Sequence, residues 1–397
     1  MLPSQNQPGL YRMTAAGLCA SLLGIGLARF AYTPLFTGLI AAKWFDPDQA
    51  AWIGAANLGG YLAGALLAQP LARRMPACAA LRAAMLLAAA AFFACASPFG
   101  FVWFSLWRFG SGVAGGVIMV LAAPAILPHV PPDRRGLASG AIFVGVGAGI
   151  VASGTLVPAL LRWGLTEAWI GLGILALALT AIAWFGWPAT NAVAEDTPAP
   201  HARFGTAFWL LCLGYGLNAF GLVPHMVFLV DFVARFLGQG LAAGAHYWVL
   251  FGAGAVIGPL LAGAAADRIG FAPALRLAFL LQAAAIALPA ISTAPLALAI
   301  SSVVVGAFVP GVAPLALGRV QEIAAPALRK TAWSWCTAAF AIGQSAGAYG
   351  MTALFVRSDH VYGLLFGLGA LALTVAFVID TAPDMIRSRD IRITELQ

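Results

Sequence analysis

Long apolar runs constrain the fold of this chain more than any other feature of its sequence. Twelve runs reach about 20 residues or more, which is enough for an α-helix to cross roughly 30 Å of hydrocarbon. Lipid offers no water to the backbone, so only helices or closed β-barrels can span it. Because the runs lack the two-residue alternation of barrel strands, we expect an all-α membrane protein. The expected spans are 14–38, 50–71, 77–97, 100–128, 137–161, 166–187, 206–230, 243–266, 272–292, 295–321, 331–355 and 360–380.

The composition excludes a soluble globular protein and argues against a nucleic-acid partner. Hydrophobic residues make up 62% of the 397 residues and charged residues only 9%, whereas soluble domains are about 25% charged. Fifteen of the 21 basic residues fall on one side of the expected bundle, and only Lys43, Arg162, Arg235 and Arg357 fall on the other. The positive-inside rule then places both termini in the cytoplasm, and we expect the protein to lie in a bacterial inner membrane.

The chain divides into two related halves. The polar stretch 188–205 is rich in Pro and Ala, and it predicts a cytoplasmic linker between halves 1–187 and 206–397. Residues 64–82 align without gaps onto 258–276, and the alignments of 23–34 with 213–224 and of 134–139 with 329–334 have nearly the same offset. We therefore expect two pseudo-symmetric units of six helices, with a solute site near the membrane midplane between them.

The most informative polar residues are two arginines inside apolar runs, Arg29 in GIGLARFAYTP and Arg108 in FSLWRFGSGVAGG. A charge inside a membrane span is costly and usually functional. Each arginine is expected roughly 12–14 Å from the outer end of its helix, so the pair could clamp a carboxylate or phosphate. Alternatively, either arginine could bond helix carbonyls and brace the bundle, or extend towards the headgroups. The sequence places no acidic residue deep in a span, and we expect Asp231 and His246 to be solvated near the outer surface.

Further candidates are polar residues on the same helices or on their counterparts in the second half. His225, which follows Pro224, is the candidate for proton coupling, although packing alone could also explain a buried histidine. The remaining candidates for substrate binding could instead make interhelical hydrogen bonds. They are Tyr32, Asn57, Tyr61, Tyr215, Asn218 and Gln344.

No cofactor or metal site is expected. The five cysteines form no Cys-x-x-Cys pair, and there is no Walker-type phosphate loop, so ATP is not the expected energy source. The sequence also lacks a His-Glu-x-x-His motif and a paired intramembrane Asp, which argues against an enzyme.

Two motifs resemble those of the major facilitator superfamily. Gly263-Ala-Ala-Ala-Asp267-Arg268-Ile-Gly270 is similar to the loop motif of that superfamily, and Arg108 begins an element similar to its fourth-helix motif. The resemblance implies a fold of twelve helices and a gating role for Gly263, Asp267, Arg268 and Gly270. The equivalent first-half loop is degenerate, with Gln69, Arg73 and Pro76 at the motif positions. ARFAYTP together with SGAIFVGVGAGI resembles the YbfB/YjiJ-like branch, which implies no settled substrate.

These observations predict a secondary active transporter that moves a small, anionic organic solute by alternating access, with proton coupling as the default implied by the resemblance. We expect a monomer whose partners are the solute and the lipid bilayer. Efflux of multiple drugs or hydrophobic compounds is the alternative, although lipophilic cations usually call for a membrane-embedded acid. A membrane sensor without transport is a third alternative.

Overall fold

The computed structural model describes residues 9–131, 135–188, 204–325 and 328–395, and all regular structure in these ranges is helical. The helices of the first half are α1 (Leu10–Ser21), the π-helix η1 (Leu22–Leu27), α2 (Tyr32–Ala41), α3 (Pro47–Arg74), α4 (Ala77–Ala94), α5 (Phe101–Ile126), η2 (Leu127–His129), α6 (Arg135–Leu161) and α7 (Leu165–Ala183). Those of the second half are α8 (Thr206–Gly221), the π-helix η4 (Pro224–Phe228), α9 (Leu229–Asp231), the π-helix η5 (Phe232–Phe236), α10 (Gly240–Ile269), α11 (Phe271–Ile291), α12 (Pro295–Ile323), α13 (Arg329–Arg357) and α14 (Tyr362–Glu395).

The expected spans match these helices closely. Eleven helical segments of the described chain are long and apolar enough to cross a membrane. The twelfth expected span, 331–355, corresponds to α13, which has 29 residues but a more polar sequence. Most boundaries agree within about four residues. The largest difference inside the bundle is at 206–230, which continues through η5 to Phe236.

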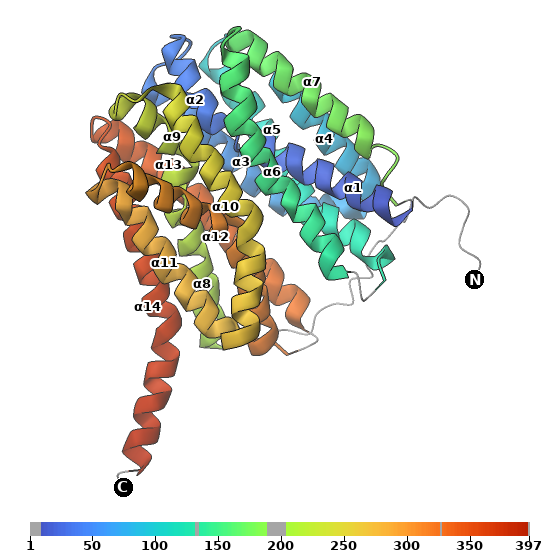
Figure 1. Cartoon of the computed structure of the whole chain (residues 1–397). Coiled ribbons are helices and arrows are strands. Elements are labelled where there is room, and N and C mark those ends of the chain that lie inside the picture. The colour runs from blue at the N-terminus through green and yellow to red at the C-terminus, as the bar shows by residue number, and fades with distance from the viewer. Residues whose placement is uncertain (1–8, 132–134, 189–203, 326–327, 396–397) are drawn as a thin grey trace, which may run out of the picture.

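The two halves lie side by side as two groups of helices (Figure 1). α1–α7 form one group, and α8–α14 form the other. α3 packs along α13, and α6 packs along α10, so two helix pairs join the groups. Most of the expected linker, 189–203, lies outside the described residues.

Glycines hold the helices of each half close together. A Cβ atom on Gly60 of α3 would lie 2.0 Å from the carbonyl oxygen of Phe109 on α5. In the second half, a Cβ on Gly258 of α10 would lie 1.8 Å from the carbonyl oxygen of Ala307 on α12. Such distances permit only glycine, so the two halves repeat the same backbone-to-backbone seam between their second and fourth membrane helices.

The first membrane helix of each half is interrupted. In the first half, η1 leads into a turn over 28–31 before α2 begins, and in the second half the π-helix η4 begins at Pro224. A π-turn inserts one residue and changes which side chains face the neighbouring helices, and such turns are frequent at functional sites. A proline such as Pro34 commonly ends or bends a helix. The interruption instead precedes Pro34, which lies in the first turn of α2.

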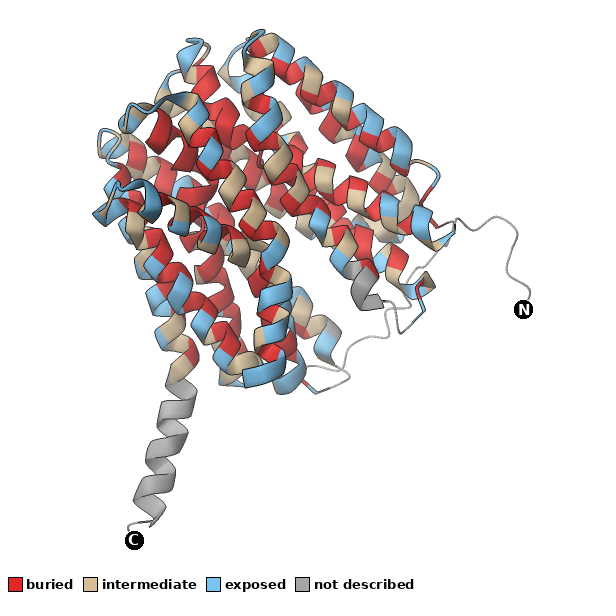
Figure 2. Ribbon diagram, viewed as in Figure 1, coloured by how far each residue is buried: buried red, intermediate tan, exposed pale blue. Residues whose placement is uncertain are grey.

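Burial follows the pattern of a membrane protein. Buried residues fill the interior, and exposed residues lie along the outer faces of the helices (Figure 2). The outer faces carry large apolar side chains, including Leu260, Ile291 and Leu296, each more than 70% exposed. A soluble protein rarely exposes such a continuous apolar surface, so these faces are suited to lipid.

Candidate functional site

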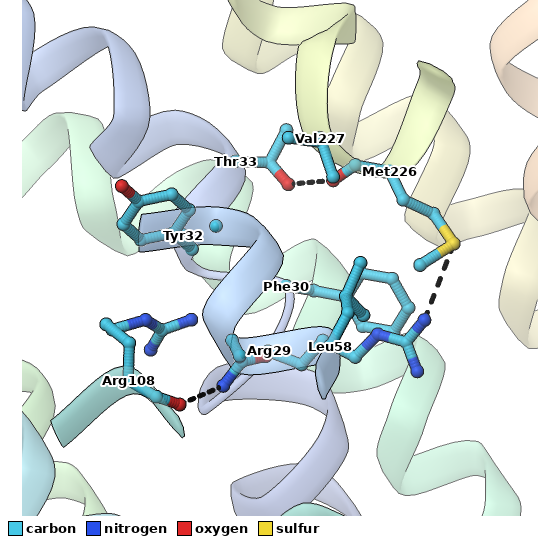
Figure 3. A pocket seen from close by; sticks show the side chains of 10 residues that line it. Arg29, Phe30, Tyr32, Thr33, Leu58, Arg108, Met226 and Val227 are labelled. Atoms are coloured by element: carbon cyan, nitrogen blue, oxygen red, sulfur yellow. Dashed lines mark hydrogen bonds between the residues drawn. The ribbon is translucent and has the colours of Figure 1, made fainter. Parts of the chain in front are cut away.

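A small cavity lies between the two halves, at the interruptions of their first helices. The space between its atoms amounts to about 280 Å³, part of it open to solvent, and it is so narrow that it admits little more than a water molecule. Figure 3 shows its lining, in which α2 and the turn before it face η4. The ten lining residues are Arg29, Phe30, Tyr32, Thr33, Gly54, Asn57, Leu58, Arg108, Met226 and Val227.

Arg108 is held by the interrupted first helix. Its Nη1 donates a hydrogen bond of 2.7 Å to the carbonyl oxygen of Ala28, and the Ser111 hydroxyl donates to the same oxygen at 3.3 Å. The guanidinium group lies over the Tyr32 ring, 4.7 Å from its centroid, and the side chain is 2% exposed. Asn57 Nδ2 donates to the Arg108 carbonyl oxygen at 2.9 Å. Arg108 therefore supports the helix interruption with one nitrogen and leaves others for a different partner.

Arg29 reaches across to the second half. Its Nη2 lies 3.6 Å from the sulfur of Met226, and its guanidinium carbon lies 5.0 Å from the ring centroids of both Phe30 and Tyr61. In Figure 3 the Arg29 side chain extends towards Met226, whereas Arg108 lies beside Tyr32. The two guanidinium groups line one cavity but have different partners.

The cavity contains more hydrogen-bond donors than acceptors. Arg29 Nε, Arg108 Nε and Arg108 Nη2 are buried and have no partner among the described residues. None of the ten lining residues is acidic. Two guanidinium groups without a carboxylate create a site that would favour an anion.

The other predicted binding residues divide into two groups. Tyr32 and Asn57 line the cavity, Tyr61 lies beneath Arg29, and Gln344 Nε2 lies 3.7 Å from the sulfur of Met226. The remaining two differ. Tyr215 packs against the ring of Phe340 and lies close enough to Tyr61 of the first half for an electrostatic interaction. Asn218 faces the interior of the second half, where its Nδ2 donates to Gln282 Oε1 at 2.5 Å.

His225 also faces the interior of the second half, although it adjoins Met226 in sequence. Its Nε2 lies 2.7 Å from the Ser301 hydroxyl, which itself donates to the Ala285 carbonyl oxygen at 2.6 Å. This arrangement assigns the proton to Nε2. Nδ1 is buried without a partner among the described residues, and the side chain is 0% exposed.

Asp231 corrects the expectation that the acid near the end of this helix is solvated. It is 0% exposed, because the helix continues beyond residue 230 and α2 covers it. Arg235 donates to its two carboxylate oxygens at 2.5 and 2.7 Å, and Tyr362 donates a short hydrogen bond. Thr37 of the first half donates at 3.1 Å. The expectation of a solvated carboxylate was therefore wrong, although Asp231 lies only five residues before the end of the span at Phe236.

Asp231 belongs to a line of contacts that we call the distal seam, on the side of the bundle opposite the chain ends. Its three contacts join Thr33 to the Met226 carbonyl oxygen, Thr37 to Asp231, and His360 to Asp48, with His360 Nε2 lying 2.7 Å from Asp48 Oδ1. Two further hydrogen bonds between the halves run from the Ser345 hydroxyl to the Leu58 carbonyl oxygen, at 3.0 Å, and from Trp248 Nε1 to the Ser153 hydroxyl, at 2.9 Å. The halves are thus joined on the distal side.

The expected gating motif lies on the opposite, terminal side and does not join the halves. Asp267 and Arg268 are exposed, and Asp267 has no hydrogen-bond partner in the described chain. Arg268 Nη1 donates to the Ala264 carbonyl oxygen of its own helix at 3.3 Å. Gly263 has open space around it, and Gly270 has φ +87°, a conformation that favours glycine at the turn.

Sequence reasoning missed four residues that join the halves: Thr33, Thr37, Met226 and Asp231. A signal existed for Asp231, because Asp231 and Arg235 are four residues apart and share one helix face. Thr33 and Thr37 are likewise one turn apart. Nothing in the sequence distinguishes Met226 from an ordinary core methionine.

A family model described as "Uncharacterised MFS-type transporter YbfB" matches residues 21–381. The chain belongs to this family. As a member of the major facilitator superfamily it is a membrane transporter rather than an enzyme, and the resemblance found in its motifs is confirmed. No curated protein matches the chain.

Solved structures of transporters share the fold of this family member. A nucleoside transporter, NupG, is 13% identical, covering 93% of this chain and 99% of its own, with a TM-score of 0.75. A bacterial homologue of the human lysosomal transporter Spinster, described as inward-facing and occupied, is 18% identical, covering 96% of each chain, with a TM-score of 0.69. Its inward-facing, unoccupied form is 17% identical, covering 94% of each chain, with a TM-score of 0.65. At these identities the likeness establishes the fold and leaves the solute open.

Proposed function

We propose that this transporter moves a small organic anion across the bacterial inner membrane by alternating access, and that Arg29 and Arg108 bind the anion. The observation that carries the proposal is the set of unpartnered guanidinium nitrogens in a cavity without an acidic residue. A buried donor that lacks an acceptor is unfavourable by about 1–3 kcal/mol. A carboxylate or phosphate would supply the missing acceptors.

The position of the cavity supports the proposal of alternating access. Arg29 and Arg108 come from the first half, whereas Met226 and Val227 come from the second. A solute in this cavity would contact both halves, so its binding could favour their movement relative to each other. The distal seam closes one side of the cavity through Thr33, Thr37 and their partners.

Efflux of lipophilic cations is supported less well. Asp231 is the buried acid that such a function could require, but Arg235 already neutralises it and it is not among the residues that line the cavity. Two guanidinium groups in the cavity would repel a cation. The test below therefore includes lipophilic cations, so that efflux can be distinguished from anion transport.

Thermal unfolding of the purified protein with a panel of small organic anions and lipophilic cations tests the proposal. An anion at about 100 times its dissociation constant should add roughly 2.7 kcal/mol to the free energy of unfolding. We expect this stabilisation in the wild type and its loss in Arg29→Ala and Arg108→Ala. Arg82→Ala is the matched control, because Arg82 is a partly buried arginine whose Nε and Nη2 bond the Trp184 carbonyl oxygen away from the cavity.

The outcomes separate the two functions. Stabilisation by anions that only the cavity variants lose would support anion transport, and flux of the same anion into liposomes would then measure it. Stabilisation by cations alone, or by anions equally in all variants, would contradict the proposal. Arg108→Lys retains the positive charge but cannot present two sets of guanidinium nitrogens. If Arg108→Lys is as stable as the wild type without ligand but binds the anion more weakly, the loss in Arg108→Ala reflects anion binding and not the hydrogen bond to Ala28.

Proton coupling through His225 is a separate part of the proposal. His225 adjoins Met226 in the cavity wall, and its Nδ1 is the atom that could accept a proton. We expect His225→Gln to retain anion binding and to lose the response of anion flux to an imposed pH gradient. If the response to the gradient survives in His225→Gln, His225 does not couple protons.

A further inference from the structure

Two hydrogen-bond donors, one from each half, are directed at the sulfur of Met226. Arg29 Nη2 approaches it at 3.6 Å from the first half, and Gln344 Nε2 approaches it at 3.7 Å from α13 of the second half. A thioether sulfur is only a weak acceptor. A guanidinium and an amide directed at one atom match a carboxylate oxygen much better than they match sulfur.

The side-chain amide of Gln344 also has one atom that makes no hydrogen bond in the described chain. It is 2% exposed, and its Oε1 is buried without a hydrogen-bond partner in the described chain. An amide presents a donor at one end and an acceptor at the other, whichever way its terminal group is rotated. A ligand that satisfies Gln344 therefore needs an acceptor and, beside it, a donor.

Met226 can leave this position. Its side chain is unbranched with three rotatable bonds, so it can take up other conformations at low energetic cost. Its backbone is fixed separately, because the Thr33 hydroxyl donates to the Met226 carbonyl oxygen. Figure 3 shows the two interactions at opposite ends of the residue. The side chain can therefore move while the contact between the halves persists.

We infer that Met226 is a removable placeholder, and that the solute is an α-hydroxycarboxylate whose carboxylate replaces the sulfur between Arg29 and Gln344. The α-hydroxyl donates to Gln344 Oε1. This inference rests on the proposed function, since it identifies the class of anion that the same site binds. A hydroxyl group suits the site better than an ammonium group, because Arg29 and Arg108 would repel the positive charge of the ammonium group.

The proposal explains why residues from both halves meet at one atom. Arg29 belongs to the first half and Gln344 to the second, so a carboxylate between them would connect the halves at the cavity. The sulfur makes the same connection weakly when it occupies this position. The placeholder keeps the two donors from being wholly unpaired in the buried site.

Paired ligands that differ only in the α-hydroxyl group test the inference. We would measure dissociation constants of the full-length protein for lactate and propionate, and for malate and succinate, by isothermal titration or thermal shift. We expect the hydroxylated member of at least one pair to bind at least about tenfold more tightly, because a site built to bond a hydroxyl rejects analogues that lack it.

Two variants assign the preference to named residues. Gln344→Leu should remove the preference for the hydroxyl group while propionate or succinate still binds. Met226→Leu keeps a similar volume but removes the competing acceptor, so it should tighten carboxylate binding several-fold. Unfolding without ligand controls for folding of both variants. If Gln344→Leu does not fold, the comparison of paired ligands in the wild type still decides the question.

The outcomes distinguish this inference from the proposed function. Equal binding of both members of every pair, with Arg29→Ala still abolishing it, would overturn the α-hydroxycarboxylate and leave anion transport intact. A preference for the hydroxyl group that survives in a folded Gln344→Leu would overturn the role of Gln344. Failure of every carboxylate to bind would contradict both proposals, and binding of lipophilic cations in its place would favour efflux.

Discussion

The distal and terminal sides of the interface between the halves are built differently. On the distal side, Asp231 is buried and bonded to Thr37 of the other half. On the terminal side, Asp267 is exposed and has no hydrogen-bond partner within the described chain. The acid in the recognised motif is thus free in this conformation, whereas an acid outside any motif joins the halves. A motif can identify a family without identifying the contact that holds a given conformation.

Among the substitutions considered, Asp231→Asn should have the largest effect on how often the distal seam opens. Breaking a buried ion pair is destabilising by about 3–5 kcal/mol, and we expect less here because the Arg235 side chain is 30% exposed. The distal seam should open more often. The measurement is the rate at which an impermeant thiol reagent, added from the distal side, labels Val227→Cys in a background without native cysteines. We expect an increase of at least about tenfold, the factor that 1.4 kcal/mol produces.

Asp380→Asn is the matched control for this experiment. Asp380 is also a buried acid paired with an arginine of the second half, at 2.9 Å from Arg276. It differs from Asp231 because Asp231 also accepts a hydrogen bond from Thr37 of the first half. Labelling of Val227→Cys should not change. Equal acceleration by the two substitutions would mean that general loosening of the bundle, and not the distal seam, controls access.

Asp267→Asn should slow transport several-fold without changing the labelling of Val227→Cys. In the conformation described here the carboxylate has no partner to lose, so the distal seam should remain closed. In the opposite conformation Asp267 can accept hydrogen bonds from the N-terminus of a neighbouring helix. Solute flux into liposomes measures the rate. An unchanged rate in correctly folded protein would exclude a gating role for the loop motif.

Thr37→Val should have a smaller effect on the distal seam than Asp231→Asn. It removes one hydrogen bond between the halves while Arg235 and Tyr362 still hold the carboxylate. A typical hydrogen bond contributes about 0.5–1.5 kcal/mol, so labelling of Val227→Cys should accelerate about two- to tenfold. Thr37→Ser retains the hydroxyl and should label at the wild-type rate. If Thr37→Ser and Thr37→Val behave alike, the hydroxyl is not the relevant group.

The contact of His360 with Asp48 should contribute least. Both side chains are more than a third exposed, and exposed ion pairs contribute about 0–1 kcal/mol. Labelling of Val227→Cys should therefore accelerate less in His360→Ala than in Thr37→Val, because the lost contact is exposed to water. Acceleration in His360→Ala equal to that in Asp231→Asn would contradict this ranking.

The fold was predictable because membrane spans depend on length and hydrophobicity, which a sequence states directly. The repeat was also visible, since equivalent glycines such as Gly64 and Gly258 are 194 positions apart and pack in equivalent seams. Interruptions of the first and seventh spans were less visible. A π-turn changes the register of a helix by one residue without changing its composition.

The site was predictable only in part. Arg29 and Arg108 stand out because charge is rare in such runs, and the structure places both at one cavity. Asn218 and His225 stand out equally, yet they face the interior of the second half. Polarity shows that a residue needs a partner inside the membrane, but it does not show where the partner lies. Met226 was missed because an apolar side chain gives no such signal.

The glycine seams make each half a stiff body, and stiffness determines how far a small movement is transmitted. Where a Cβ atom would lie 1.8–2.0 Å from a neighbouring carbonyl oxygen, helices cannot slide apart without losing their closest contact. A half that turns about the distal seam then behaves as a lever. α10 has 30 residues and is roughly 45 Å long, so a rotation of about 10° would move its far end by about 8 Å. A change no larger than a side-chain rotation at the cavity could in this way widen the opposite end enough to admit a small solute.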